Sequence, residues 1–298
     1  MASLYIVSTP IGNLGDISRR AVEVLNAADV VLAEDTRRTG VMLKLLDIQA
    51  RLISAHEHNQ ASRAGTVVEI LREGRDVAMV TDAGTPLLSD PGARIVREVV
   101  EAGFDVVPVP GASALLAALV ASGIDAGTFT FLGFPPRKGG SRAEMMEEIA
   151  ASPRAVVLYE SPNRVGKLLR DLAEAAGGER RVCVARELTK MHEEFWRGTL
   201  AEGVERYEDA EVLGEVVVVV AGRPEDVERE EEVDALAAHS IAQALLGQGQ
   251  SASAVAKELR RRMGISRNDA YRIAQEAAGA AESAEAAESA ESAEAAEE

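Results

Sequence analysis

The sequence predicts an α/β fold made of two domains and a small helical module, and three observations support this prediction. Apolar segments of strand length alternate with amphipathic helical patterns over residues 1–124, which indicates a mostly parallel sheet covered on both faces. Residues 125–222 contain a second set of alternating segments. At 298 residues, the chain is long enough for two separate hydrophobic cores.

Five strands, with helices between them, are expected in the first domain, residues 1–124. Ile17, Ala21, Val24 and Leu25 recur at the spacing that places apolar side chains on one face of a helix. The expected strands are 4–8, 30–33, 51–54, 77–81 and 105–109.

Glycines at positions 123 and 127 indicate the boundary of the second domain, residues 125–222. The segments near 182 and 196 are so close in the sequence that an antiparallel hairpin is expected, which makes this sheet mixed. The expected strands are 128–133, 155–160, 181–186, 194–200 and 215–222, and the expected helices lie near 142–150 and 163–176.

Three further segments follow the two domains. Residues 223–234 are rich in glutamate and are expected to be an acidic linker. Residues 235–275 predict a small helical module whose pattern near 253–263 and after Ser266 is similar to a helix-turn-helix. Residues 276–298 repeat Ala, Glu and Ser without a large apolar side chain, so a disordered acidic tail is expected.

Composition limits the class of protein. Hydrophobic residues make up 47% of the chain, which is typical of a globular protein, and the single cysteine, Cys183, excludes intramolecular disulfides. The longest apolar runs, 114–121 and 216–221, are far shorter than the ~20 residues of a membrane helix. No basic leader precedes an apolar stretch. These observations predict a soluble, cytoplasmic protein with no membrane partner.

The net charge of −17 at first argues against a nucleic-acid partner. Eight of the glutamates lie from Glu276 onward, where there is no Lys or Arg, so residues 1–275 carry −9. Any RNA binding must therefore depend on a local basic surface. Arg260, Arg261, Arg262, Arg267 and Arg272 make the helical module such a candidate.

The most informative segment is the loop 81–92, which directly follows the apolar strand 77–80. It contains two carboxylates, three hydroxyls, two glycines and two prolines. Open α/β sheets bind ligands beyond the carboxyl ends of their strands, and glycine allows the backbone to approach a ligand closely. The loop therefore predicts a binding site, while its last part, Ser89 to Gly92, is expected to start the next helix. A purely structural turn is the alternative.

Other loops at strand ends are expected to join the same cleft. Pro10 to Gly15 has two of the three glycines of a dinucleotide-binding fingerprint, and Glu34 lies where the ribose-binding acid would be. However, Pro10 replaces the first glycine, which argues against a nicotinamide or flavin enzyme. His56-Glu57-His58 is not a metalloprotease motif, because its histidines are two residues apart rather than four, and no metal site is expected.

The chain contains seven ordered motifs, at 4–17, 33–37, 56–59, 81–92, 133–138, 159–164 and 185–190. Together they closely resemble the bacterial ribosomal RNA small subunit methyltransferase I family, of the tetrapyrrole methylase-like class of S-adenosylmethionine enzymes. The resemblance spans residues 3–222 and continues more loosely over 235–275. Ser8 and Pro10 stand where tetrapyrrole methylases typically have glycines, which argues against a corrinoid or sirohaem substrate.

The resemblance implies a two-domain methyltransferase that binds S-adenosyl-L-methionine in a cleft between its α/β domains. Its reaction would be 2′-O-methylation of the ribose of a decoding-centre cytidine in 16S rRNA of the small ribosomal subunit. A homodimer is expected by the same resemblance. Two alternatives remain, a small-molecule methyltransferase acting on tetrapyrroles and an RNA-binding protein without catalytic activity.

Within this interpretation, site residues are assigned by position. Asp35 or His56 is expected to assist deprotonation of the ribose hydroxyl, with Glu34 and Glu160 as further candidates. Substrate phosphates are assigned to Arg37, Arg137, Lys138 and Arg164, for which a solvated surface role is the alternative. Expected cofactor contacts are Pro10, Gly12, Asp82, Ala83, Gly84, Thr85, Leu87, Ser113, Phe131 and Leu132, although Ser113 could instead cap a helix and the last two could belong to the core.

Overall fold

The computed structural model describes residues 2–56, 60–208, 210–263, 265 and 269–279. The chain divides into two compact units, Met1–Arg223 and Pro224–Glu298, each of which is described by itself. The first unit contains two five-stranded sheets, so the expected pair of α/β domains is confirmed.

The first sheet is entirely parallel, with the strand order β3-β2-β4-β1-β5. All residues of β2 and β4 are buried, as expected for central parallel strands that are covered on both faces. The strand bounds are Ser3–Val7 for β1, Val30–Ala33 for β2, Leu52–Ser54 for β3, Val77–Val80 for β4 and Asp105–Val109 for β5.

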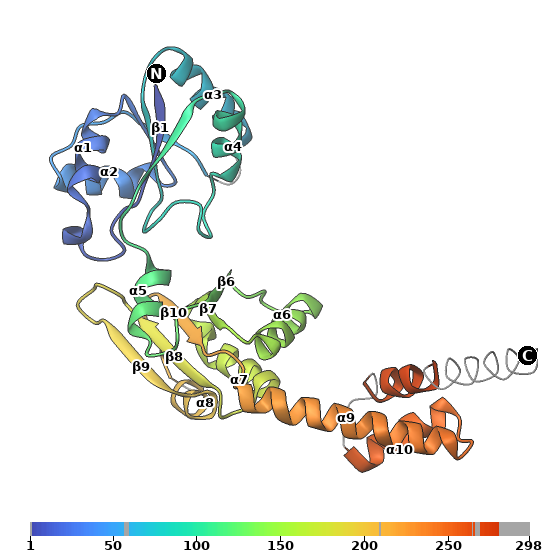
Figure 1. The fold of residues 1–298 in the computed structure, drawn as a ribbon. Helices are drawn as coiled ribbons and strands as arrows, with labels where there is room; N and C mark the ends of the chain where they lie inside the picture. The colour runs from blue at the N-terminus through green and yellow to red at the C-terminus, as the bar shows by residue number, and fades with distance from the viewer. Residues whose placement is uncertain (1, 57–59, 209, 264, 266–268, 280–298) are drawn as a thin grey trace, which may run out of the picture. The chain divides into compact units, whose positions relative to one another are not determined.

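Helices pack on both faces of this sheet. In Figure 1, α1 and α2 lie on one side of β1, and α3 and α4 lie on the other. Leu25 and Leu43 contribute to the core on the first side, and Val67 and Ile95 contribute to the core on the second. The bounds are Arg19–Ala27 for α1, Thr36–Leu45 for α2, Gln60–Arg72 for α3 and Ala93–Glu101 for α4; a short 3-10 helix, η1, spans Leu14–Asp16.

The second sheet is mixed, with the order β6-β7-β10-β8-β9. Only β6 and β7 are parallel, and β8 forms the expected antiparallel hairpin with β9, in which Val184 lies opposite Trp196. The bounds are Phe129–Gly133 for β6, Ala155–Glu160 for β7, Arg181–Arg186 for β8, Glu194–Thr199 for β9 and Val216–Val220 for β10.

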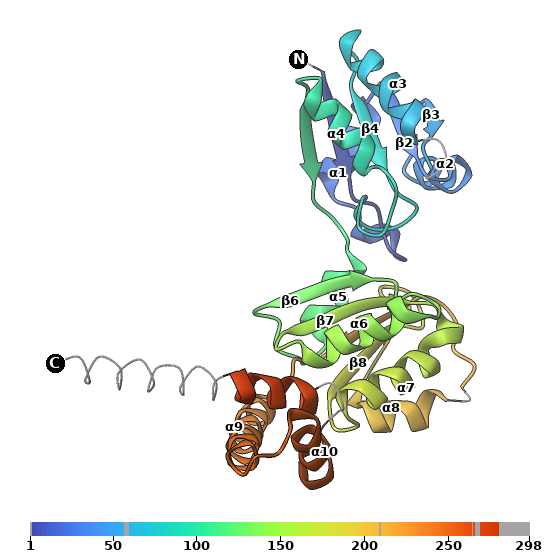
Figure 2. The ribbon, with the colours of Figure 1, turned by 90° about the vertical axis from the view of Figure 1, so that its right-hand side faces the viewer.

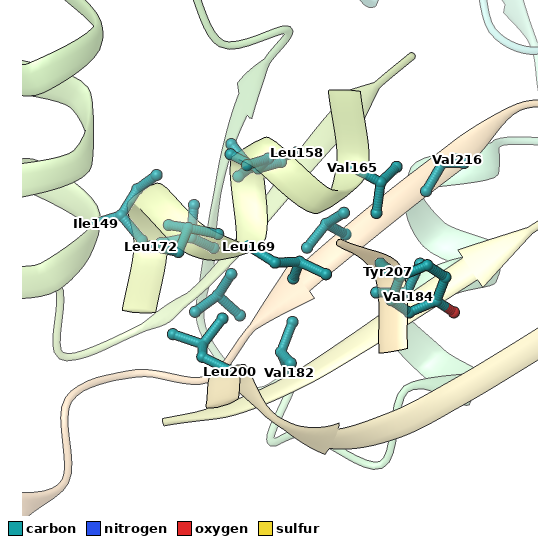
Figure 3. Packing of buried hydrophobic residues seen from close by; sticks show 14 of the residues in the cluster. Ile149, Leu158, Val165, Leu169, Leu172, Val182, Val184, Leu200, Tyr207 and Val216 are labelled. Carbon is teal, nitrogen blue, oxygen red and sulfur yellow. The ribbon is translucent and has the colours of Figure 1, made fainter. Parts of the chain in front are cut away.

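Strand β10 separates two cores. Val216, Val218 and Val220 face one of them, and Val217 and Val219 face the other, because successive side chains of a strand point to opposite faces. Figure 3 shows the first core, in which Leu158, Leu169 and Leu200 pack together. Its helices are α6 (Gly140–Ala151), α7 (Val165–Ala176) and α8 (Leu200–Tyr207), and the 3-10 helix η2 spans Pro162–Arg164.

Helix α5 (Ala114–Ala121) belongs to the second sheet, although the boundary was expected after residue 124. Leu115 and Leu119 pack on the face of the sheet that carries Val217 and Val219, and Figure 2 shows α5 against the sheet that contains β7. The chain therefore passes from the first sheet to the second between β5 and α5. The glycines at 123 and 127 lie in the loop after α5, so the boundary that we inferred from them lies too far along the chain.

The second unit is helical, as expected, but it begins earlier in the chain. Helix α9 spans Glu225–Gly247, so most of residues 223–234, which were expected to be a linker, are helical. Helix α10 spans Ala252–Met263, and a further helical segment covers 269–279. Ala277 is buried with Leu245, Leu259 and Ile273, so the packed module extends past residue 275, and the rest of the expected tail, 280–298, lies outside the described residues.

Among the helices that the structure describes, none combines the length and the apolar character that crossing a membrane requires.

Leu169→Ala tests the core of the second sheet. Leu169 is fully buried, so its truncation leaves a cavity and should lower the free energy of unfolding by about 2–5 kcal/mol. Urea unfolding followed by circular dichroism measures this change. Leu213→Ala is the matched control, because Leu213 is 65% exposed and the change should stay within about 0.5 kcal/mol. Equal losses in the two variants would contradict the assignment of the core.

Candidate functional site

The loop after β4 has a specialised backbone. Leu87 and Ser89 have φ values of 76° and 68°, and Gly84 and Gly92 have φ values of 85° and 127°. Non-glycine residues rarely adopt this left-handed region, and when they do they cluster at ligand sites. The conformation bends the loop so that several of its residues face one cavity.

Hydrogen bonds hold this loop against two neighbouring loops. Thr9 and Gly84 exchange two backbone hydrogen bonds, with N···O distances of 2.9 and 3.1 Å. The Thr9 hydroxyl donates to the carbonyl of Thr81 at 3.2 Å, and the Thr85 hydroxyl donates to the carbonyl of Ala112 at 3.1 Å. The loops that follow β1, β4 and β5 are thereby joined at one edge of the sheet, as expected for parallel strands.

A cavity of about 430 Å³ lies beside the joined loops, within the usual size range of small-molecule sites. Both sheets contribute to its walls. The first contributes Glu34, Arg38, Thr81, Asp82, Ala83, Gly84, Thr85, Leu88, Ser89 and Asp90, among others; the second contributes Phe134, Tyr159, Glu160, Ser161, Pro162, Leu188 and 214–217.

Carboxylates dominate the charge of the cavity. Glu34 accepts a hydrogen bond from the Thr81 hydroxyl at 3.0 Å. Asp82 accepts from the backbone N–H of Asp35 at 3.1 Å and forms an ion pair with Arg38 at 3.2 Å. Because the lining contains five carboxylates and a single arginine, the cavity favours a cationic ligand.

Asp90 has the most unusual ionisation of these carboxyl groups. Burial, together with the negative charges of Glu34 and Asp82, raises its pKa to about 6, while a hydrogen bond with Thr81 opposes the shift. A carboxylate whose pKa lies near neutral pH is suited to accept a proton. Asp90 is therefore a candidate proton acceptor in the cavity lining.

Glu160 lies at the end of β7 and is 2% exposed. Its Oε1 accepts from the backbone N–H of Ser161 at 2.6 Å and pairs with Nη2 of Arg164 at 2.5 Å. Its Oε2 is buried and has no hydrogen-bond partner in the part of the chain that the structure describes. One oxygen of this carboxylate is thus buried without a hydrogen bond, while Arg164 and Ser161 hold the other.

Aromatic rings stand next to Glu160. Tyr159 packs edge-on against Phe131, with ring centroids 4.9 Å apart, and lies 5.5 Å from the ring of Phe134. The Tyr159 hydroxyl accepts from the backbone N–H of Leu115 at 3.3 Å, and burial raises its pKa. Phe134 is 53% exposed, so an apolar ring face remains accessible at the cavity.

Half of the expected cofactor residues line this cavity: Asp82, Ala83, Gly84, Thr85 and Ser113. Ser113 also caps α5, because its hydroxyl accepts from the N–H of Leu116 at 3.5 Å, so both roles considered for it are compatible.

The other expected cofactor residues do not line the cavity. Leu87 packs against the core of the first sheet, and Leu132 and Phe131 pack against the two cores of the second. Pro10 is half-buried. Gly12 contacts the loop 188–190, since a Cβ there would lie 2.9 Å from Thr189 Oγ1.

Neither expected catalytic residue lines the cavity. The Asp35 carboxylate caps α2 and accepts from Arg37 Nη2 at 2.8 Å. Hydrogen bonds from Arg37 lower the pKa of Asp35 to about 2, which makes it a weak proton acceptor. His56 is exposed, and its motif partners at 57–59 lie outside the described residues.

The expected phosphate contacts are not gathered at one place. Arg37 is exposed and pairs with Asp35, and Arg137 and Lys138 are exposed in the loop before α6. Arg164 is engaged with Glu160. Arg164 therefore orients a buried carboxylate. Of the four expected contacts, Arg137 and Lys138 are the two that form no ion pair with a carboxylate of the described residues.

The sequence interpretation missed the role of Ser89 and Asp90. Both were expected to start the next helix, but the N-cap of α4 is Gly92, and both residues line the cavity. The sequence did contain a signal for this position. The loop has a second carboxylate, Asp90, in addition to Asp82, whereas capping one helix needs only one side chain. Tyr159 and Phe134 belonged to recognised motifs but had been given no role.

Within the described residues, no group of three His, Cys, Asp or Glu side chains has the arrangement of a metal site.

Comparison with known proteins places the chain in a family. The family model of the Tetrapyrrole (Corrin/Porphyrin) Methylases matches residues 3–203. A Ribosomal RNA small subunit methyltransferase I from Synechocystis is 45% identical over 76% of this chain and 81% of its own length. Proteins of the same name are 44% identical in Micromonospora olivasterospora (93% and 88% covered) and 41% identical in Escherichia coli O157:H7 (93% and 96% covered).

Solved structures agree on the fold. Cobalt precorrin-4 methyltransferase, a cobalamin biosynthetic enzyme, aligns with a TM-score of 0.57 at 22% identity, over 74% of this chain and 94% of that one. Uroporphyrin-III C-methyl transferase from Thermus thermophilus, complexed with S-adenyl homocysteine, aligns with a TM-score of 0.54 at 19% identity, over 74% and 97%. The chain therefore belongs to the ribosomal RNA small subunit methyltransferase I family, within the Tetrapyrrole (Corrin/Porphyrin) Methylases.

Proposed function

We propose that the protein transfers a methyl group from S-adenosylmethionine to the ribose 2′-oxygen of a decoding-centre cytidine in 16S rRNA. The observation that carries the proposal is an acid-lined cavity, beside the loop 81–92, in a chain that is 41–45% identical to proteins named for methylation of small-subunit rRNA. The names of these relatives supply the substrate class, and the chemistry of the cavity supports the cofactor.

The cavity fits S-adenosylmethionine in size and charge. The cofactor carries positive charge on its sulfonium and amino groups, and the lining carries the carboxylates of Glu34, Asp82 and Asp90 around a single arginine. The left-handed backbone at Gly84 favours glycine, and a Cβ there would lie 3.2 Å from Ile11 Cγ2, so the loop can pack closely beside the cavity. The residues that would hold the cofactor are Asp82, Ala83, Gly84, Thr85 and Ser113.

When bound, S-adenosylmethionine supplies an electrophilic methyl group on a positively charged sulfur. A ribose hydroxyl is a poor nucleophile, so the protein must align it and accept its proton as the new O–C bond forms. We assign the role of proton acceptor to Asp90, because it lines the cavity and has a pKa of about 6. Asp35 has the opposite shift and is bound to Arg37.

Binding of the rRNA is assigned to exposed cations, since phosphate contacts dominate affinity for nucleic acids. Arg137 and Lys138 are exposed in the loop before α6. In the helical module, Arg261 and Arg262 pair with Glu258, and Arg272 pairs with Glu276. These ion pairs reduce the net charge that the module offers to RNA. A homodimer and a cytoplasmic location stay predictions.

Labelled methyl transfer tests the proposed function. The protein, S-adenosylmethionine with a labelled methyl group, and either naked 16S rRNA or small subunits from a strain lacking the enzyme are incubated together, and the modified nucleotide is mapped. The expected product is a cytidine methylated on its ribose. Label on a base, or no label on either RNA substrate, would contradict the proposal; labelling of a tetrapyrrole such as uroporphyrinogen III would favour the small-molecule alternative.

Asp90→Asn tests the assigned proton acceptor. The variant should lower kcat roughly 100-fold or more, which is a usual contribution of general base catalysis, while cofactor affinity is retained. In the unchanged protein, kcat should rise with pH through about 6 as Asp90 loses its proton. Asp35→Asn is the matched comparison and should keep most of the activity. Equal losses in the two variants would refute the assignment.

The raised pKa of Asp90 also predicts a stability change. The folded chain holds this proton more tightly than the unfolded chain, whose ordinary value is 3.8, so Asp90 lowers the free energy of unfolding as pH rises from about 4 through 6. Asp90→Asn should therefore be more stable than the unchanged protein at pH 7, and the difference should shrink at pH 4. Thermal unfolding at both values measures it.

Removal of residues 224–298 tests the helical module. The remaining unit, Met1–Arg223, has its own cores, so affinity for S-adenosylmethionine, measured by calorimetry, should change little. Affinity for small ribosomal subunits, measured by filter binding, should fall and should depend less steeply on salt, because cations are lost. Equal loss of both affinities would indicate that the module supports folding instead.

A further inference from the structure

The outer side of helix α2 carries a group of exposed cations and apolar side chains. Thr39 and Leu43 are the buried residues of this helix, and Leu43 packs in the core between the helix and the first sheet. The exposed residues recur three or four positions apart, so they share one face of the helix. We call them the α2 face; they are Arg37, Arg38, Val41, Lys44 and Leu45.

The charge of the α2 face is opposite to that of the whole chain. The chain carries −17, whereas α2 contains three cations and no Asp or Glu. Among the described residues of the first unit, every other α-helix that contains Lys or Arg also contains Asp or Glu. The positive end of the helix dipole adds to the charge near Arg37 and Arg38. A cationic surface of this kind on an acidic protein fits a polyanion.

The α2 face begins beside the cavity. Arg38 belongs to the cavity lining, and its Nη1 lies 3.2 Å from Oδ2 of Asp82. Lys44 lies roughly 10 Å farther along the helix than Arg37, since each helical residue advances the chain by about 1.5 Å. In the proposed reaction a ribose must reach the cavity, and that ribose has a phosphate on each side. Cations that extend from the cavity along one helix can therefore bind the phosphates that follow.

The ion pairs of the two arginines leave donors for a phosphate. Arg37 donates Nε and Nη2 to Asp35, and Arg38 donates Nη1 to Asp82. Their side chains are 90% and 72% exposed, and a guanidinium has five N–H donors, so each can also contact a ligand in solvent. Lys44 is exposed and forms no ion pair with a carboxylate within the described ranges.

Apolar side chains lie among these cations. Val41 and Leu45 are 62% and 68% exposed and are about one helical turn apart. Single-stranded RNA presents unstacked bases together with its phosphates. The flat face of such a base can cover these side chains, which removes apolar surface from water.

We propose that the α2 face binds single-stranded RNA next to the target nucleotide, with its cations on the phosphates and its apolar side chains against a neighbouring base. This inference rests on the proposed function, and it names the surface that holds the substrate. Phosphate contacts position a nucleic acid without reading its sequence. The α2 face therefore strengthens substrate binding and leaves the rate of methyl transfer in the bound complex unchanged.

Arg37→Gln/Lys44→Gln tests the α2 face and leaves Arg38 in place beside Asp82. Affinity for small subunits from a strain lacking the enzyme is measured by filter binding at several salt concentrations. Each lost phosphate contact should reduce the slope of log affinity against log salt by about 0.7, so the double variant should bind roughly 25-fold more weakly at about 0.1 M salt. KM for the subunits should rise by a similar factor, while kcat and the affinity for S-adenosylmethionine, measured by calorimetry, stay the same.

Two further variants separate the position of the charge from folding and from net charge. Arg37→Lys/Lys44→Arg keeps both charges, so its affinity should stay within about twofold of that of the unchanged protein. Arg72→Gln/Arg75→Gln is the matched control, because it removes the same charge just before β4, at the sheet edge opposite to the cavity. Arg75 forms a local ion pair, as Arg37 does. Equal losses of affinity in the two glutamine variants would show that only net charge matters, which contradicts the inference.

The remaining outcomes separate this inference from the proposed function. If the unchanged protein methylates small subunits and Arg37→Gln/Lys44→Gln keeps the full salt slope, the α2 face does not bind RNA and the inference is wrong while the function stands. If the variant has a different molecular mass in solution, measured by light scattering, the face binds a second copy of the chain and the inference is also wrong. If the unchanged protein methylates neither naked 16S rRNA nor small subunits, the proposed function itself fails.

Discussion

The parallel pairing of β1 with β4 and β5 is the constraint on which the site depends. Parallel strands end at the same edge of a sheet, so the loops after these strands meet there. The two hydrogen bonds between Thr9 and Gly84 then join the first two loops, and Thr85 joins the third through the carbonyl of Ala112. Without this edge, the left-handed loop 81–92 would have no neighbours to hold its shape.

The second sheet provides the other wall of the cavity. Its central strand β10 packs a core on each face, one against α7 and one against α5, and this packing orients the end of β7, where Tyr159 and Glu160 lie. A rigid scaffold is needed there, because a buried carboxylate with one unpaired oxygen is unfavourable and persists only when its surroundings fix it. Arg164 and Ser161 supply that fixation through Oε1.

The local electrostatic environment shifts the pKa values of two carboxyl groups, Asp35 and Asp90, in opposite directions. Hydrogen bonds from Arg37 lower the pKa of Asp35 to about 2. In contrast, burial beside Glu34 and Asp82 raises the pKa of Asp90 to about 6. The two residues have the same chemistry, and both follow a strand of the same sheet. Their environments alone make one a helix cap and the other a candidate base.

The sequence by itself determined the α/β class, the mixed second sheet and the loop 81–92 as a candidate ligand site, because strand periodicity, a close pair of strand segments and an unusual density of glycine, proline and carboxylate residues are local signals. It determined the family through its motifs as well. Only the tertiary structure decided that α5 belongs to the second sheet, that 225–234 is helical, and that Asp90, rather than Asp35, lines the cavity. Those outcomes depend on which surfaces pack together and how far each carboxyl group is removed from water, and neither property can be read from residues that are adjacent in the chain.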